Sequence, residues 1–317
     1  MIRYRTFRND DPPALAAIWR NQGVRRALVQ PMTPDLLERH VLSKPYFDRE
    51  GLMVAVGEEG PVGFAHAAFG AKEDRSDIDR QIGVICLVMV DRGPDHETIS
   101  RSLLSRCEDY LKTSGARVLH AGQIAPHDPF YRGLFGGSEM SGIPVTDEDD
   151  LRLFKTAGYH PTDEVSILQL DLTRFRPPID RGQILIGRRC NMTRLEDPSA
   201  GDWWEACTWG ETNRSRFELC SRDDGSPFAS VTYWDIEPLA SSWGVHAVGV
   251  TRLLVSADSR REGRATYLMG QSLKQLHHEG ATLAEAHVAE ANTTGLALFG
   301  KLGFREIDRG IVLRKEV

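Results

Sequence analysis

The stretch that decides the fold is Val255-Ser256-Ala257-Asp258-Ser259-Arg260-Arg261-Glu262-Gly263-Arg264-Ala265, which joins an apolar run to an amphipathic one. It fits the pattern R-x-x-G-x-G/A, with Arg260, Gly263 and Ala265 at the fixed places. Small residues let a ligand approach the backbone, and the start of a helix presents free N–H groups to an anion. The arginines add positive charge, which suits a pyrophosphate. On this motif alone, a surface helix start with solvated arginines is an equally good interpretation.

A second motif follows in Asn292-Thr293-Thr294-Gly295-Leu296-Ala297-Leu298-Phe299-Gly300-Lys301-Leu302-Gly303-Phe304. An apolar strand, the R-x-x-G-x-A loop, a helix, another strand and then this motif occur in that order. The combination resembles the GNAT superfamily of acyl-CoA-dependent N-acetyltransferases. The resemblance is good over residues 184 to 317 and weaker over residues 2 to 173.

The first half of the chain repeats the element order of the second half. Leu153 to Tyr159 matches Leu298 to Phe304, and Val90 ends an apolar strand as Val255 does. We therefore expect an α/β (α+β) fold of two tandem GNAT-like domains, each with a mixed, mostly antiparallel central sheet flanked by helices. The architecture is similar to that of mycothiol synthases, but no residue match supports their substrate. The expected parts are a degenerate N-terminal domain at 1–173, a linker at 174–183 and a C-terminal acetyl-CoA-binding domain at 184–317.

Local patterns give further expectations. The stretch from Ile184 to Arg189, which begins with three apolar residues, predicts a strand. Phe304 to Ile307 with Ile311 to Arg314 predicts a closing hairpin around Asp308-Arg309-Gly310. The irregular stretch from Pro126 to Val145 is long for a loop without structure of its own, so a functional or mobile role is expected.

Composition excludes several function classes. Lys+Arg is 39 and Asp+Glu is 45, so the formal net charge is −6, which disfavours nucleic acid as a partner. The chain has 5 cysteines and no C-x-x-C pair, which predicts neither a disulfide framework nor a metal site. No apolar run is long enough to span a membrane. These features predict a cytoplasmic protein, monomer or homodimer, without membrane contact.

The resemblance implies roles for individual residues. Backbone groups of Leu253, Leu254 and Val255 would pair with the pantetheine arm of acetyl-CoA, the expected co-substrate, and one N–H would polarise the acetyl carbonyl. Asn292 would contact the pantetheine arm, and Phe299 would lie beside the thioester. The pyrophosphate would be held by the loop and helix start formed by Arg260, Arg261, Glu262, Gly263, Arg264, Ala265 and Thr266.

The departures from the family pattern concern the chemistry. Phe299 stands where the family often has a tyrosine that protonates the leaving thiolate. The central strand from Gly249 to Val255 lacks the carboxylate that often serves as general base. Glu285, His287 or His246 are candidate substitutes if they lie within reach. For any one of them, an ordinary hydrogen-bonded polar role is the better interpretation.

The first half departs further from the pattern. Asp95 and Glu97 bring negative charge to the loop that would hold a pyrophosphate, Thr98 and Ser100 replace its small residues, and Asp147 replaces the asparagine. Like charge weakens anion binding. We therefore expect a non-catalytic repeat without CoA, which packs on the second half and helps shape its acceptor cleft.

These observations predict an N-acetyltransferase that moves an acetyl group from acetyl-CoA to a primary amine by direct attack. The acceptor is a small-molecule or peptide amine that the sequence does not identify. The alternative is a non-catalytic CoA-binding sensor or regulatory module, which Phe299 and the missing carboxylate favour. A partner-binding protein that has lost CoA is a third interpretation, and Gly263, Ala265 and Asn292 count against it.

Overall fold

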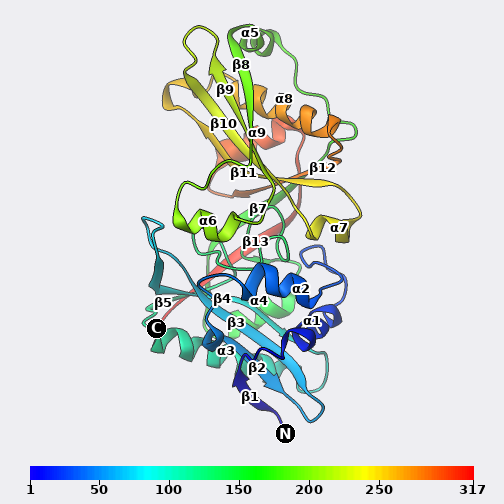
Figure 1. Cartoon of the computed structure of the whole chain (residues 1–317), viewed down its shortest axis with the longest axis vertical. Coiled ribbons are helices and arrows are strands. Elements are labelled where there is room, and N and C mark those ends of the chain that lie inside the picture. The colour runs from blue at the N-terminus through cyan, green and yellow to red at the C-terminus, as the bar shows by residue number, and fades with distance from the viewer.

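The computed structural model describes residues 1–317, and a 13-stranded sheet runs through the length of the chain (Figure 1). The strands of the first half are β1 (Arg3–Thr6), β2 (Leu52–Val56), β3 (Pro61–Ala71), β4 (Ile78–Val90), β5 (Val118–Ala121), β6 (Ile143–Pro144) and β7 (His160–Asp171). Those of the second half are β8 (Cys190–Glu196), β9 (Arg214–Ser221), β10 (Pro227–Asp235), β11 (Ala247–Val255), β12 (Leu283–Ala289) and β13 (Arg305–Glu316).

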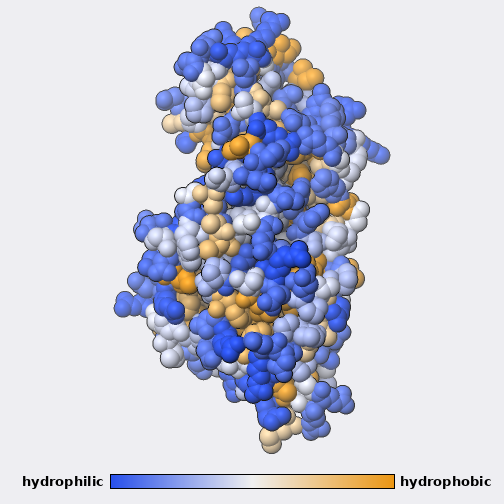
Figure 2. Space-filling view, viewed as in Figure 1, coloured by the Kyte–Doolittle hydropathy of each residue, from blue (hydrophilic) through white to orange (hydrophobic).

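Helices cover the sheet in two lobes, one for each half (Figure 1). The first half has α1 (Pro12–Asn21), α2 (Pro34–Leu37), α3 (His96–Thr113) and α4 (Glu148–Thr156), with a π-helical turn η1 (Glu38–Leu42) and a 3-10 turn η2 (Arg49–Gly51). The second half has α5 (Arg181–Arg189), α6 (Trp203–Trp209), α7 (Leu239–Trp243), α8 (Arg264–His278) and α9 (Thr293–Leu302), with a 3-10 turn η3 (Ala257–Ser259). No helix combines the length and the apolar character needed to cross a bilayer. The face seen in Figure 2 is mainly hydrophilic, and its apolar residues form separate patches.

The strand order is the same in both halves when it is read from each outer edge. It runs β1-β2-β3-β4-β5-β13 from one edge and β8-β9-β10-β11-β12-β7 from the other. In each half the fourth and fifth strands are parallel, whereas the outer pairs are antiparallel. The expected repeat of one mixed, mostly antiparallel sheet is therefore present.

The two long central strands are exchanged between the halves. β7 belongs to the first half in sequence but pairs with β12 of the second half. β13 ends the second half and pairs with β5 of the first half. β7 and β13 also pair with each other, from Arg305↔Gln169 to Arg314↔His160. Each half therefore needs a strand of the other half to complete its sheet.

The matching motifs of the two halves form the same local structure. Each helix is followed by a glycine with positive φ, which is +89° at Gly158 and +92° at Gly303. Such backbone suits glycine because it has no Cβ. An aromatic residue of the helix packs edge-on against one after the glycine. The ring centroids are 5.4 Å apart for Phe154–Tyr159 and 5.0 Å apart for Phe299–Phe304.

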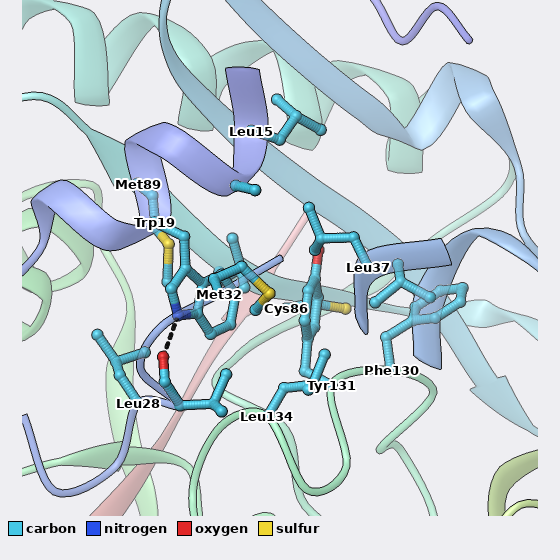
Figure 3. Close-up of a cluster of buried hydrophobic side chains, with 14 of the residues drawn as sticks. Leu15, Trp19, Leu28, Met32, Leu37, Cys86, Met89, Phe130, Tyr131 and Leu134 are labelled. Carbon is cyan, nitrogen blue, oxygen red and sulfur yellow. Dashed lines mark hydrogen bonds between the residues drawn. The ribbon is translucent and has the colours of Figure 1, made fainter. Parts of the chain in front are cut away.

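A buried apolar cluster joins the two halves. Trp19 of α1 and Tyr131 of the long loop lie at its centre (Figure 3), and Trp234 and Leu239 of the second half belong to it as well. The indole Nε1 of Trp19 donates a hydrogen bond to the carbonyl oxygen of Val29 at 3.0 Å. Because its members come from both halves, this cluster helps to fix one half against the other.

The strand predicted over Ile184 to Arg189 is wrong. These residues form most of α5, and Asp180 caps that helix by accepting a hydrogen bond from the N–H of Gln183 at 2.8 Å. A short apolar run fits a strand and a helix equally well, and here the cap favours the helix.

The predicted closing hairpin is also wrong, since β13 is one long strand from Arg305 to Glu316. Its pairing with β7 shifts register twice, between Glu306 and Asp308 and between Val312 and Leu313. Gly310 marks a close approach, not a turn, because a Cβ there would lie 1.7 Å from the carbonyl oxygen of Ser141.

Candidate active site

β11 and β12 separate to form a fork in the second half. They pair in parallel only from Ala247↔Leu283 to Val250↔Ala286. Beyond Val250, β11 stays with β10 after a register shift between Val231 and Tyr233, while β12 stays with β7. The open edge of β11 beyond the fork is therefore available to an extended ligand.

Of the three strand residues predicted to meet the pantetheine arm, two direct their backbone groups to the open edge and Leu254 does not. The N–H of Ser256 donates to the carbonyl oxygen of Phe228 on the β10 side at 2.9 Å. Since successive residues of a strand direct their backbone groups to opposite edges, Leu254 also faces β10, whereas Leu253 and Val255 face the fork. The side chain of Leu254 is exposed.

The loop from Ser256 to α8 presents a row of free N–H groups. The N–H groups of residues 261 to 266 donate to no backbone or side-chain acceptor, and they surround the start of α8. Left-handed backbone at Arg261 (φ 66°) and Gly263 (φ 79°) shapes this row. Successive free N–H groups at a helix start form an anion-binding concavity. The loop thus has the geometry expected of a pyrophosphate site.

The arginines of this loop have different surroundings. The guanidinium of Arg264 lies 3.6 Å from the ring of Phe228 and pairs with Glu262 at 2.7 Å, so it is held in place. Arg260 and Arg261 are exposed. Gln183 of α5 donates to the carbonyl oxygen of Gly263 at 3.2 Å, which supports the turn from behind.

The second motif has a structural role in α9. Asn292 caps the helix by accepting a hydrogen bond from the N–H of Gly295 at 2.9 Å, and it remains exposed. Phe299 is 6% exposed and packs with Phe304 in the core beneath the fork strands.

Glu285 and His287 lie together on β12 next to the point of the fork. Glu285 is fully buried and accepts hydrogen bonds from Arg26, the N–H of Ser138 and Gln169 at 2.7–2.8 Å. The Nε2 of His287 lies 3.1 Å from the same carboxylate. Burial acts to raise the pKa of Glu285, but these partners outweigh it and lower the pKa. A carboxylate held in this way is a poor proton acceptor, and it ties the two halves together.

The third candidate, His246, is separated from the other two. It is exposed, pairs with Asp235 at 3.3 Å and precedes β11 at the end away from the fork.

His287, by contrast, has a buried Nδ1 without a hydrogen-bond partner. No group of three or more histidine, cysteine or acidic side chains is arranged to hold a metal ion.

A polar cavity of about 130 Å³ adjoins the bulge of β11. Thr251 and Arg252 line it from the strand, and Trp204, Glu205 and Trp209 line it from α6 and its end. The long loop of the first half contributes Asp128, Arg132 and Glu139. Both halves are therefore needed to enclose this space.

Sequence reasoning missed Asp128, Arg132 and Glu139 as site residues. The length of the stretch from Pro126 to Val145 indicated a functional loop, but no spacing rule tells which strand such a loop crosses. Its position depends on contacts such as the 2.9 Å hydrogen bond from Trp234 Nε1 to the carbonyl oxygen of Ser138.

The first half also has a fork, between β4 and β5, with a cavity of about 260 Å³. Its loop differs from that of the second half, since Pro94 has no N–H and the N–H of His96 donates to Gly93 at 3.2 Å. Asp147, at the position of Asn292, pairs with Arg25 at 2.5 Å. Asp149 and Asp150 line the same cavity, so it is partly acidic.

One protein-family model matches a part of the second half. Residues 189–304 match the model of the acetyltransferase (GNAT) family. A search of curated proteins found no match.

Solved structures resemble the whole chain. A GCN5-related glucosamine N-acetyltransferase region of a fungal multi-domain GH3 β-N-acetylglucosaminidase is 15% identical with a TM-score of 0.72, over 99% of this chain and 38% of that one. This chain thus spans well under half of that protein. A tandem GNAT protein from the clavulanic acid biosynthesis pathway is 16% identical with a TM-score of 0.67, over 100% and 98% of the two chains. A GCN5-related N-acetyltransferase from Sphaerobacter thermophilus is 14% identical with a TM-score of 0.63, over 99% and 95%.

Proposed function

We propose that the fork between β11 and β12 binds acetyl-CoA and transfers its acetyl group to a primary amine. The proposal starts from the match of residues 189–304 to the acetyltransferase (GNAT) family model and from the tandem GNAT fold of the whole chain. One observation carries the proposal: the open edge of β11 leads directly to the free N–H groups of residues 261 to 266. An extended arm and a pyrophosphate need these two features side by side.

In this proposal each part of the site has one task. The pantetheine arm pairs with the open backbone of Leu253 and Val255, and the N–H of Leu253 stabilises the oxyanion of the transition state. The pyrophosphate lies on the N–H groups at the start of α8, with Arg260 and Arg261 nearby. Asn292 fixes the start of α9 beside the arm.

The amine attacks the thioester carbonyl directly, so that the C–N bond forms as the C–S bond breaks. Phe299 has no proton to give, and the thiolate takes its proton from the attacking amine or from water. Glu285 and His287 act as positioning residues, because Glu285 holds the N–H of Ser138 and thereby the loop above β11.

The first half binds no acetyl-CoA in this proposal and serves the reaction through its loop. Asp95 and Glu97 flank the start of α3, where they oppose a pyrophosphate. Its contribution is the loop that closes the cavity beside the bulge of β11.

The proposal is tested by measuring the free CoA thiol that is released from acetyl-CoA in the presence of each amine of a panel. Arg261→Asp is the key variant. Arg261 is exposed and has left-handed backbone, which aspartate tolerates, so the change reverses one charge without new strain. We expect the KM for acetyl-CoA to rise about tenfold. Arg92→Asp, in the matching loop of the first half, should leave it unchanged.

Two results would contradict the proposal. Equal effects of the two variants would place the co-substrate elsewhere. Binding of acetyl-CoA without acetyl transfer to any amine, and so without release of the CoA thiol, would favour the non-catalytic sensor or regulatory module.

A further inference from the structure

The cavity beside the bulge of β11 is small and charged. Its volume of about 130 Å³ is below the 300–1,000 Å³ typical of sites for drug-sized ligands, so it admits only a small molecule or the end of a larger one. Four arginines and three acidic residues line it: Arg75, Arg132, Arg214, Arg252, Asp128, Glu139 and Glu205.

Two of these arginines keep donors for a ligand. Arg132 is 8% exposed and stacks 3.7 Å from the ring of Trp209. One of its nitrogens pairs with Asp128, while Nε and Nη1 are buried without any partner. Arg252 is half exposed and reaches Glu205 only at 3.5 Å.

The other two arginines already have partners. Arg214 donates to Glu205 at 2.6 Å and to the carbonyl oxygen of Pro198 at 3.0 Å. Arg75 pairs with Asp202 at 3.2 Å. The hydrogen-bond donors left over in the cavity therefore belong to Arg132 and Arg252, and an anionic group would accept from them.

Glu139 is the free acceptor of the same cavity. Its carboxylate accepts no hydrogen bond from the protein, although neighbouring Ser138 is fixed by Glu285 and Trp234. Burial raises the pKa of Glu139 to about 8. A carboxylate of this kind suits an amine that must lose a proton near neutral pH.

We propose that this cavity is the acceptor site and that it takes an amine carrying its own anionic group, with Glu139 receiving the amine and Arg132 and Arg252 receiving the acid. The inference rests on the proposed function, because it places the acceptor next to the acetyl group. The size of the cavity favours a carboxylate, as in an amino acid.

The reaction then balances without a further reactant. The ammonium group of the acceptor gives one proton to Glu139, and the free amine attacks the thioester carbonyl. The C–N bond forms and the C–S bond breaks. The thiolate takes the second amine proton, and Glu139 returns its own proton to water.

Matched acceptors test the substrate class. Common amino acids are compared with their C-terminal amides, and glucosamine 6-phosphate with glucosamine, by thiol release. We expect kcat/KM to be at least about tenfold higher for the anionic member of a pair, since charged hydrogen bonds contribute about 1.5–3 kcal/mol. The ratio of kcat/KM within a pair should be larger for the amino acids and their amides than for glucosamine 6-phosphate and glucosamine. The reverse order would identify phosphate as the preferred anionic group. Equal rates within every pair would overturn the inference.

Two variants test the residues. Arg252→Gln should remove the preference by raising KM for the anionic acceptor about tenfold or more, with no change for its neutral partner. Arg39→Gln, an exposed arginine elsewhere, is the control. Glu139→Gln should lower kcat about a hundredfold or more and abolish the rise of rate with a midpoint near pH 8. Glu59→Gln, in the exposed turn after β2, is its control.

The outcomes separate this inference from the proposed function. If acetyl-CoA binds and amines are acetylated but Arg252→Gln and Glu139→Gln behave like their controls, the inference is wrong and the proposed function stands. If wild-type protein binds no acetyl-CoA in calorimetry, the proposed function itself fails.

Discussion

At the scale of single residues, the burial of His66 changes its pKa and so should affect stability. It lies on β3 with no exposed surface, and its Nδ1 is 2.9 Å from the hydroxyl of Tyr131. Burial lowers the pKa of His66 to about 3, so the ring stays neutral in the folded protein. Because Tyr131 belongs to the loop that lines the cavity beside the bulge of β11, this contact ties the loop to β3.

Acid should therefore destabilise the protein through His66. The pKa is lower in the folded state than its ordinary value of 6.5, so the stabilisation is present above pH 6.5 and is lost as the pH falls toward 3. Between pH 7 and pH 4 this group should cost about 3 kcal/mol of unfolding free energy. Urea unfolding of wild type and of His66→Gln, which does not titrate, measures the difference. Identical losses in the two proteins would show that His66 stays unprotonated or contributes nothing.

At the scale of elements, the long loop after β5 lines the cavity beside the bulge of β11 and crosses β13 at close range. Gly142 has φ +79°, and a Cβ there would lie 2.4 Å from the carbonyl oxygen of Ile311. Gly158, after α4, has φ +89° but no atom within 4 Å of such a Cβ. The two glycines share the backbone requirement and differ only in the crossing.

Alanine substitutions at these glycines separate strain from close approach. Gly158→Ala should cost about 1–2 kcal/mol, the penalty for left-handed backbone. Gly142→Ala should cost clearly more, since strand and loop must also move apart. Denaturant midpoints with unchanged m-values measure both. Equal costs would mean that the loop can leave β13 without penalty.

These elements also explain which features the sequence can predict. The second-half loop was predictable because its glycine obeys a local rule, as the left-handed backbone of Gly263 illustrates. Asn292 was predicted to contact the pantetheine arm, and its role as the cap of α9 was not foreseen. The segment 184–189 was not predictable, because its three apolar residues are too few to tell a helix from a strand by their spacing. Gly310 was misread as a turn because Ser141, the loop residue that approaches it, is distant in sequence. Glu139 was missed for a similar reason: neighbouring Ser138 is held in place by Glu285 and Trp234 of the other half.

At the scale of the whole molecule, the exchange of β7 and β13 makes the halves dependent on each other. β13 lies between β5 and β7, and β7 lies between β13 and β12. Separating the halves would leave unpaired strand edges in both and would open the shared apolar cluster. The cavity beside the bulge of β11 would be lost as well, because both halves enclose it.

A chain cut between the halves should therefore stay together. A protease site inserted between Pro178 and Ile179, where Ile179 is exposed, lies outside the exchanged strands. After cleavage the two fragments should elute as one 1:1 complex in size-exclusion chromatography and retain thiol-release activity. Elution as two separate folded fragments without denaturant would contradict the exchange.

Calorimetric titration with acetyl-CoA tests most directly the central claim that only the second-half fork holds the co-substrate. Wild type should bind one acetyl-CoA per chain. Gly263→Asp places a carboxylate and a strained Cβ at the start of α8 and should weaken binding at least about tenfold. Gly93→Asp, in the matching loop of the first half with no atom within 4 Å of its Cβ, should bind as wild type does. Two molecules per chain, or binding lost in Gly93→Asp and kept in Gly263→Asp, would contradict the account.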